Sequence, residues 1–457
     1  MLDPIKKLNL SYLDYLQSDP ERSVRQLRQL RAYLSDNKCT FRGEPMPTLL
    51  KPNFISRRQA GLLGRCVERM SGILDKFVRF YLENREMRDI MKFTGQENEL
   101  FSLDPGHGHS IVLSRLDAFL KGDEVKFLEF NCDSPAGIAY SDVLEEGFRE
   151  IFRDYRFLDR WKLRSFRRQD LLLASLLRCY GNFRSLRRGM PVKPVIAIVD
   201  WKEVSTYSEF QLHAEHFRRC GYECLIASPL DFTVRNGRAL AGDRPVHLVY
   251  RRVITRELIS RQKEAPGFIE SIKRGLVCCC NPFRSCIVGN KKVLSILIKP
   301  RFQEICTKAE RRIINETVPW TEILADRPVL YGNRRVDLGE FVLKNRAHLV
   351  LKPANMYGGK DVHLGRETEQ GTWEEIMHRH IRDESWVVQE YIDIPSEPYP
   401  ETGPPLRLKN KYVNINPFAL LGAYSGTITR ISDHPVINVS AGGGLVPTFT
   451  AEQKLRG

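Results

Sequence analysis

Oxygen-bearing side chains and a guanidinium group recur with a spacing of two residues at two nearby places in the sequence. Arg115 precedes Asp117 by two positions, and Glu129 precedes Asn131 by two. Carboxylate and amide oxygens are ligands that Mg²⁺ prefers, and phosphate often completes its coordination shell. The four residues therefore indicate a site that holds magnesium against a phosphate.

The surrounding segments predict the hairpin that would bring these residues together. Residues 111–120 and 125–131 are rich in apolar side chains and predict two strands, with turn-forming residues at 122–124. Side chains two apart share one strand face. A three-residue loop would set the aspartate opposite the glutamate and the arginine opposite the asparagine, whereas a four-residue loop would break this register. The alternative is that the carboxylates are ordinary solvated residues on the polar face of a hairpin.

A lysine and two glycines follow the buried strand that residues 349–353 predict. Lys352, near the end of that strand, could supply a positive charge to an α-phosphate. The next loop contains Gly358, Gly359 and Lys360, and its backbone amides could close over the β- and γ-phosphates of a nucleotide. A plain hairpin turn is the alternative interpretation of this loop.

Two later segments carry groups of the same kind. Residues 386–392 predict the next strand, where Glu390 could hold a ribose or an adenine. Residues 424–430 end in Arg430 and precede the glycine-rich stretch 437–444, which predicts a second loop with exposed backbone amides. Two loops suited to phosphate are stronger evidence for a nucleotide site than one.

Taken in order, these blocks resemble a circularly permuted ATP-grasp protein, of the kind that includes eukaryotic-type glutathione synthetase and glutathionylspermidine-synthetase-like ligases. The resemblance covers roughly residues 110–150 and 190–450 and includes a further block at 289–292. In unpermuted ATP-grasp enzymes the metal-binding acidic-x-Asn strand comes last, whereas here it precedes the phosphate loop. The resemblance implies an α/β (α+β) fold, a circularly permuted ATP-grasp with an inserted βαβ support domain and an N-terminal helical region.

The resemblance also implies roles for single residues. Arg115 would contact a substrate carboxylate or the acyl phosphate, and Arg430 would stabilise the transferring phosphoryl group. Magnesium would be bound by Asp117, Glu129 and Asn131. Lys291 or Lys292, with Lys352, would contact the phosphates, and Glu390 the nucleoside. The full set implied to bind ATP is Lys291, Lys292, Lys352, Tyr357, Gly358, Gly359, Lys360, Gln389, Glu390 and Asn438.

One position departs from the family pattern. Related loops often carry an acidic residue just before the glycine-rich segment, where this chain has Asn355 and Met356. The change would remove one metal ligand, for which Asp117 or Asn355 could compensate. The second magnesium ion, and with it full catalytic competence, is therefore an open question at the level of sequence.

The implied reaction is the ATP-dependent joining of a carboxylate to an amine. The carboxylate attacks the γ-phosphate of ATP, and an amine captures the resulting acyl phosphate to form an amide or peptide-like bond, with Mg²⁺ assisting. The partners would be small-molecule or peptide carboxylates and amines. Two alternatives are a catalytically weakened nucleotide-binding or scaffold protein and an ATP-grasp phosphotransferase with another acceptor.

Changes in composition along the 457 residues predict four regions. The first is mainly helical, the second holds the metal-binding hairpin and basic helices, the third is a βαβ support or substrate domain, and the fourth binds the nucleotide. No G-x-G-x-x-G follows the strand predicted at 195–199, which argues against dinucleotide binding by the third region. The regions are 1–105, 106–190, 191–280 and 281–457.

The net charge of +15 is concentrated partly in a basic band at residues 153–188, which overlaps a segment predicted to be helical from 140 to 177. A basic helical face is the simpler interpretation, and an acidic carrier is a partner that such a face would suit. We do not expect sequence-specific nucleic-acid binding, because no zinc-finger or RNP-type motif accompanies the charge.

The remaining bulk features predict a cytoplasmic protein without a membrane partner. No signal peptide is apparent, and the apolar run 171–177 is far shorter than the roughly 20 residues that span a bilayer. Eleven cysteines are an odd number, and those at 278–280 and 286 lack the paired C-x-x-C spacing of a zinc site. We therefore expect reduced thiols rather than disulfides.

Overall fold

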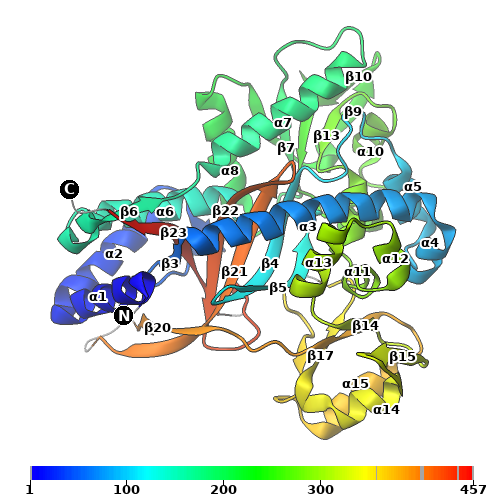
Figure 1. Cartoon of the computed structure of the whole chain (residues 1–457). Coiled ribbons are helices and arrows are strands. Elements are labelled where there is room, and N and C mark those ends of the chain that lie inside the picture. Colours follow the sequence, from blue (N-terminus) through cyan, green and yellow to red (C-terminus); the bar gives the residue numbers. More distant parts are fainter. Residues whose placement is uncertain (1–2, 357, 402–405, 440–441, 455–457) are drawn as a thin grey trace.

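The computed structural model describes residues 3–356, 358–401, 406–439 and 442–454 (Figure 1). Its central feature is an eight-stranded sheet with the main order β3–β23–β22–β21–β4–β5, in which only the β3–β23 pair is parallel among these neighbours. Two short strands extend it, since β20 pairs with β21 and β6 with β23. The strands are β3 (Asn53–Ser56), β4 (Leu113–Lys121), β5 (Glu124–Asn131), β6 (Trp161–Arg164), β20 (Ser396–Pro400), β21 (Leu408–Leu420), β22 (Ala423–Ser432) and β23 (Gly444–Gln453).

The longest helix, α3 (Arg57–Glu83), packs against β21 and β22 and crosses the sheet in Figure 1. It begins at a capping box in which Ser56 Oγ accepts from the Gln59 N–H and Gln59 Oε1 accepts from the Ser56 N–H. Apolar residues at helical spacing over residues 24–34 and 61–84 predict two helices, which α2 and α3 confirm. The N-terminal helices are α1 (Pro4–Ser18), α2 (Pro20–Asp36), α3, α4 (Arg85–Met91) and α5 (Gly95–Ser102), and the short strands β1 (Thr40–Phe41) and β2 (Glu44–Pro45) lie between them. Among the helices of the described residues, none has the length and apolar character needed to cross a bilayer.

The continuous helix expected over residues 140–177 is wrong. Helix α6 (Ile138–Phe152) is followed by a 3-10 turn at Arg156–Arg160, strand β6 and then α7 (Arg168–Ser185). The reason is the alternation in β6, where half-buried residues 161 and 163 are separated by exposed residues at 162 and 164. The basic band therefore does not form one helical face.

A second sheet consists of four parallel strands in the order β13–β12–β7–β8. Apolar runs at 223–227 and 246–250 predict strands, residues 208–220 a helix and residues 232–240 a hairpin. These elements and the strand predicted at 195–199 are all confirmed. The sheet contains β7 (Ile196–Val199), β8 (Cys224–Ala227), β12 (Leu248–Arg251) and β13 (Cys278–Cys280). Around it lie α8 (Tyr207–Arg219), β9 (Phe232–Arg235), β10 (Arg238–Ala241), β11 (Arg244–Pro245), α9 (Thr255–Ser260) and α10 (Pro266–Lys273).

A third, antiparallel sheet has the order β14–β19–β17–β18 and lies at one end of the molecule, in yellow in Figure 1. The strands predicted at 349–353 and 386–392 are confirmed as β17 (Leu349–Pro353) and β19 (Trp386–Glu390), and the fully buried Trp373 packs in the small core of this lobe. The other elements are a 3-10 turn at Phe283–Gly289, α11 (Lys292–Leu297), α12 (Pro300–Glu304), α13 (Lys308–Thr317), β14 (Thr321–Ile323), β15 (Pro328–Tyr331), β16 (Arg334–Asp337), α14 (Leu338–Lys344), a 3-10 turn at Arg346–His348, β18 (His363–Leu364) and α15 (Gln370–His380).

One buried side chain joins the parallel sheet to the β4–β5 hairpin. Asn281 follows β13, and its Oδ1 accepts from the N–H groups of Val112 and Leu113 at 2.9 and 2.8 Å. Its Nδ2 donates to the carbonyl oxygens of Leu113 and Cys132 at 2.7 and 2.8 Å. These bonds fix the start of β4 and the end of β5 against the neighbouring sheet, because unmade hydrogen bonds in a buried site are costly.

Candidate active site

The β4–β5 hairpin has the residue pairing that the sequence suggested, but reaches it by another route. The turn consists of two residues, because Lys121 pairs with Glu124. A β-bulge at Leu128 then shifts the register by one residue, so that Asp117 pairs with Glu129. The bulge thus restores the register that a three-residue loop would have given, and Arg115 pairs with Asn131 as expected.

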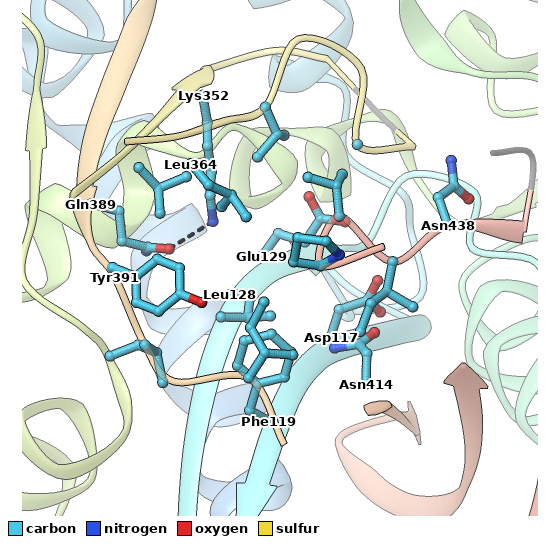
Figure 2. Close-up of a pocket in the computed structure, with 18 of the residues that line it drawn as sticks. Asp117, Phe119, Leu128, Glu129, Lys352, Leu364, Gln389, Tyr391, Asn414 and Asn438 are labelled. Atoms are coloured by element: carbon cyan, nitrogen blue, oxygen red, sulfur yellow. Dashed lines mark hydrogen bonds between the residues drawn. The ribbon is translucent and has the colours of Figure 1, made fainter. Parts of the chain in front are cut away.

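This hairpin forms one wall of a cavity whose other walls come from distant parts of the chain. Strands β17 and β19, with the loop after β17, face it, and residues 435–438 after β22 close another side (Figure 2). The lining residues are Arg115, Asp117, Phe119, Leu128, Glu129, Lys291, Val350, Lys352, Gly358, Gly359, Val362, Leu364, Gln389, Glu390, Tyr391, Ile392, Ile394, Asn414, Arg430, Pro435, Val436, Ile437 and Asn438.

Most of the candidate site residues from the sequence line this cavity. Three candidates in the described part of the chain do not. Asn131 lies beside it and donates from Nδ2 to Glu129 Oε1 at 3.3 Å. Lys292 points elsewhere and donates to the carbonyl oxygens of Ile90 and Met91. Lys360 is exposed on the loop outside the lining. Tyr357 lies outside the described residues.

Two arginines share one buried carboxylate. Arg115 donates to Asp117 from Nε and Nη2, to Oδ1 at 2.8 Å and Oδ2 at 3.2 Å, and Arg430 Nη1 donates to Oδ2 at 2.9 Å. Burial lowers the pKa of Arg430, and the nearby charge of Arg115 lowers it further. Both oxygens of Asp117 are thus bonded to guanidinium groups, and a metal ion at Asp117 would have to displace one of them.

Two lysines lie near a second carboxylate, that of Glu129. Lys291 Nζ lies 3.3 Å from Glu129 Oε2, and Lys352 Nζ donates to Gln389 Oε1 at 2.7 Å, drawn as the dashed line in Figure 2. Burial alone would raise the pKa of Glu129, but Lys291, Lys352 and Arg430 outweigh it and lower that pKa to about 2. Burial lowers the pKa of Lys352 to about 8, although Glu129 opposes this shift. Glu129 is therefore ionised at neutral pH.

Met356, at the position where the resemblance led us to expect an acidic residue, presents a backbone oxygen. The carbonyl oxygen of Met356 accepts from Lys291 Nζ at 2.6 Å, while the side chain of Met356 is 47% exposed. With its amide oriented to suit its neighbours, Asn355 accepts from Arg256 Nη2 at 2.8 Å. The side-chain oxygens of Asn355 and Asp117, the two residues expected to compensate, therefore already have cationic partners.

The balance of charge in the cavity favours an anionic ligand. Four cations, Arg115, Lys291, Lys352 and Arg430, line it together with the carboxylates of Asp117, Glu129 and Glu390, a formal excess of one positive charge (4 − 3 = 1). Charges removed from water need partners, and cations gathered in a partly buried site attract phosphate or carboxylate. The oxygens of Glu129 and Asn131 are of the type that suits Mg²⁺, which is usually held by one or two protein oxygens plus phosphate and water. A metal ion at Glu129 would replace its 3.3 Å contacts with Lys291 Nζ or Asn131 Nδ2.

Apolar side chains that the sequence interpretation missed form the rest of the lining. Phe119, Leu128, Leu364 and Tyr391 gather on one side of the cavity in Figure 2. Asn414 was also missed, and its Nδ2 donates to the Ala118 carbonyl oxygen at 2.9 Å. The local signal for Asn414 was weak, because β21 also contains Asn410 and Asn416. A largely apolar pocket with a few convergent polar groups is typical of small-molecule sites.

No protein-family profile and no curated protein sequence matches the chain. Among solved structures, it is similar to a glutathione synthetase-like effector (GSS30) from Globodera pallida in its apo form, with a TM-score of 0.63 and 11% identity over 94% of this chain and 98% of that chain. A putative gamma-glutamylcysteine synthetase from Methylobacillus flagellatus matches 85% of each chain at 10% identity and a TM-score of 0.39, too low to carry an argument. The first likeness concerns the fold alone, and it confirms the expected class, a mixed α/β chain that is similar in fold to a glutathione synthetase-like protein.

Proposed function

We propose that this protein is an ATP-dependent carboxylate–amine ligase that forms an amide or peptide-like bond through an acyl phosphate. The observation that carries the proposal is the convergence of Glu129, Lys291 and Lys352 on one cavity from three distant parts of the chain. The fold shared with a glutathione synthetase-like protein supports it. The strand carrying Glu129 precedes β17 in the chain, as a circularly permuted ATP-grasp requires.

The lysines and the glycine loop would bind the triphosphate. Lys291 and Lys352 would supply point charges, and Gly358 and Gly359 line the same cavity, where their backbone amides could bind phosphate oxygens. The apolar side chains would contact the base, with Gln389 and Glu390 at the strand that borders it. Mg²⁺ held by Glu129 and Asn131 would neutralise charge that develops on the phosphates.

The arginine pair would bind the carboxylate substrate. Arg115 and Arg430 are fixed by Asp117, so their free N–H groups are already oriented when an anion enters. In the first step a carboxylate oxygen attacks the γ-phosphorus and ADP leaves. In the second step the amine attacks the acyl carbon, inorganic phosphate leaves and the amine loses a proton. In this proposal Asp117 positions the two arginines and does not bind a metal ion.

A second candidate function is nucleotide binding with weak turnover. It is favoured by the carbonyl oxygen that Met356 presents where related loops carry a carboxylate, and by the arginine partners of Asn355 and Asp117. Fewer anionic ligands mean weaker magnesium binding and less neutralisation of the transition state. The chain would then retain the phosphate-binding lysines without efficient catalysis.

Calorimetric titration with a non-hydrolysable ATP analogue and Mg²⁺ tests the shared part of both proposals. We expect binding to the intact protein, at least tenfold weaker binding to Lys352→Ala, and unchanged binding to Lys360→Ala, since Lys360 is exposed and outside the cavity lining. Equal binding by both variants, or none by the intact protein, would overturn the nucleotide site. ADP release with pairs of amino-acid or peptide carboxylates and amines then separates ligation from binding alone.

A further inference from the structure

Three buried side chains with metal-binding chemistry meet away from the proposed active site. Cys278 and Cys280 lie two residues apart on β13, and their sulfur atoms are 4.0 Å apart. A ring nitrogen of His107, in the segment before β4, lies within 4.8 Å of both sulfur atoms. Three potential ligand atoms thus converge on one point inside the protein.

Cys179 on α7 completes the group. Helix α7 packs against β13, and the buried thiol of Cys179 lies in the neighbourhood of Cys280 and His107. All four side chains are buried, and Cys179, Cys278 and Cys280 are at most 1% exposed. The ligands come from three elements that are far apart in the sequence, which is why their spacing showed no zinc pattern.

The geometry fits a tetrahedral thiolate site. Zinc–sulfur bonds of about 2.3 Å in a tetrahedron place neighbouring sulfur atoms about 3.8 Å apart, near the observed separation. His107 Nε2 lies 3.2 Å from the Cys279 carbonyl oxygen, so a proton on Nε2 can be donated to it. Metal-ligating histidines usually donate their second ring N–H to such a group. Nδ1 then keeps its lone pair, which the His109 N–H approaches at a long 3.4 Å.

We propose that His107, Cys179, Cys278 and Cys280 bind one Zn²⁺ ion in a closed structural site. This proposal is independent of the ligase activity. A disulfide explains the cluster less well, because it would use two of the three thiols, leave the third unpaired and give His107 no role. Closed Cys₃His sites are a common structural form of zinc binding.

The site would fasten three elements behind the active-site hairpin. It joins α7, the segment leading into β4, and β13, whose next residue Asn281 holds both hairpin strands. Because metal binding and folding are coupled at such sites, chelation should lower the thermal midpoint, and we expect a loss of about 10 °C or more.

The metal content of purified variants tests the proposal. A second cluster, of half-buried Asp170 and His216 and exposed Cys220, also places three potential ligands within 4.8 Å of one another, so the measurement uses a His216→Asn background. We expect about one zinc per chain after dialysis, measured by mass spectrometry. Cys280→Ser should lose it, and Cys279→Ser should keep it, since the Cys279 side chain points to the other face of β13.

Two measurements on protein without cluster substitutions keep the test decisive if Cys280→Ser does not fold. Cobalt exchanged into the His216→Asn protein should give thiolate charge-transfer bands and the intense visible bands of a tetrahedral site. Thiol titration in denaturant with chelator and no reductant should count all 11 cysteines. A count of nine, or a dialysed His216→Asn protein without zinc and without cobalt bands, would overturn the proposal.

Discussion

The unusual pKa of Lys352 gives a quantitative prediction for nucleotide binding. Burial lowers this pKa to about 8, so the ammonium group is mostly charged at pH 7 and mostly neutral at pH 9. The protonated fraction falls from about 0.9 to about 0.1, and a bound triphosphate requires the charged form. Affinity for a non-hydrolysable ATP analogue at saturating Mg²⁺ should therefore fall about tenfold between pH 7 and 9, about 1.4 kcal/mol.

Two lysine-to-arginine substitutions test whether Lys352 causes this decrease in affinity. Lys352→Arg keeps its charge at pH 9, so this variant should bind the analogue almost equally at both pH values. Lys292 also has a pKa lowered by burial to about 8, but its Nζ donates to backbone carbonyl oxygens away from the cavity. Lys292→Arg should therefore retain the tenfold decrease of the unmodified protein.

Calorimetry at pH 7, 8 and 9 in buffers of equal ionic strength is the assay. The triphosphate itself is fully ionised over most of this range, which leaves the protein as the source of the change. A decrease that persists in Lys352→Arg, or that disappears in Lys292→Arg, would refute the reasoning, because the proton concerned would then belong to another group.

Three further predictions concern the carboxylates and the loop. Asp117→Asn should lower the free energy of unfolding, measured in urea, by about 3 kcal/mol, because it leaves two buried arginines without their anionic partner. Asp123→Asn breaks an exposed ion pair and should lower it by under about 1 kcal/mol. Equal losses in the two variants would contradict this prediction. Glu129→Gln should bind the metal-free nucleotide, but Mg²⁺ should not increase its affinity. The ionised Glu129 carboxylate stabilises the fold above about pH 4.5, and this contribution is lost as pH falls through its pKa of about 2. The free energy of unfolding of Glu129→Gln should therefore change less between about pH 4.5 and 2 than that of the unmodified protein. Met356→Glu should lower the Mg²⁺ concentration for half-maximal binding of the nucleotide about tenfold, while Met356→Gln leaves it unchanged; no difference between the two would remove the second candidate function's main support.

Local patterns predicted the strands of the site well, and non-local contacts explain what they missed. Alternation and turn residues placed Glu129 on β5 and Lys352 on β17, because these signals lie within a few residues. Nothing local indicated that β21 pairs with β4, which brings Asn414 to the cavity beside the hairpin. The choice between Lys291 and Lys292 was likewise open in the sequence, and it depends on how the chain enters α11.

The basic band and the cysteines show the same limit. Arg168 in the band is fully buried and donates to Asp142 and Glu145, which a count of charges cannot reveal. Cys179 lies near β13 only because α7 packs against the parallel sheet. The spacing of cysteines within one segment of the sequence does not indicate such a contact. The predicted region boundaries, the cytoplasmic location and an acidic carrier stay predictions.

The bulge at Leu128 has a consequence for how the hairpin tolerates insertions and deletions. Strand pairing between the bulge and the turn is offset by one residue from the pairing on the far side, where Asp117 meets Glu129. A chain with one residue added to the turn and Leu128 deleted would keep that carboxylate pairing and shed the irregularity, whereas either change alone would turn alternate side chains to the opposite face. Homologous chains could therefore differ in turn length while preserving the same chemistry, provided that the two changes occur together.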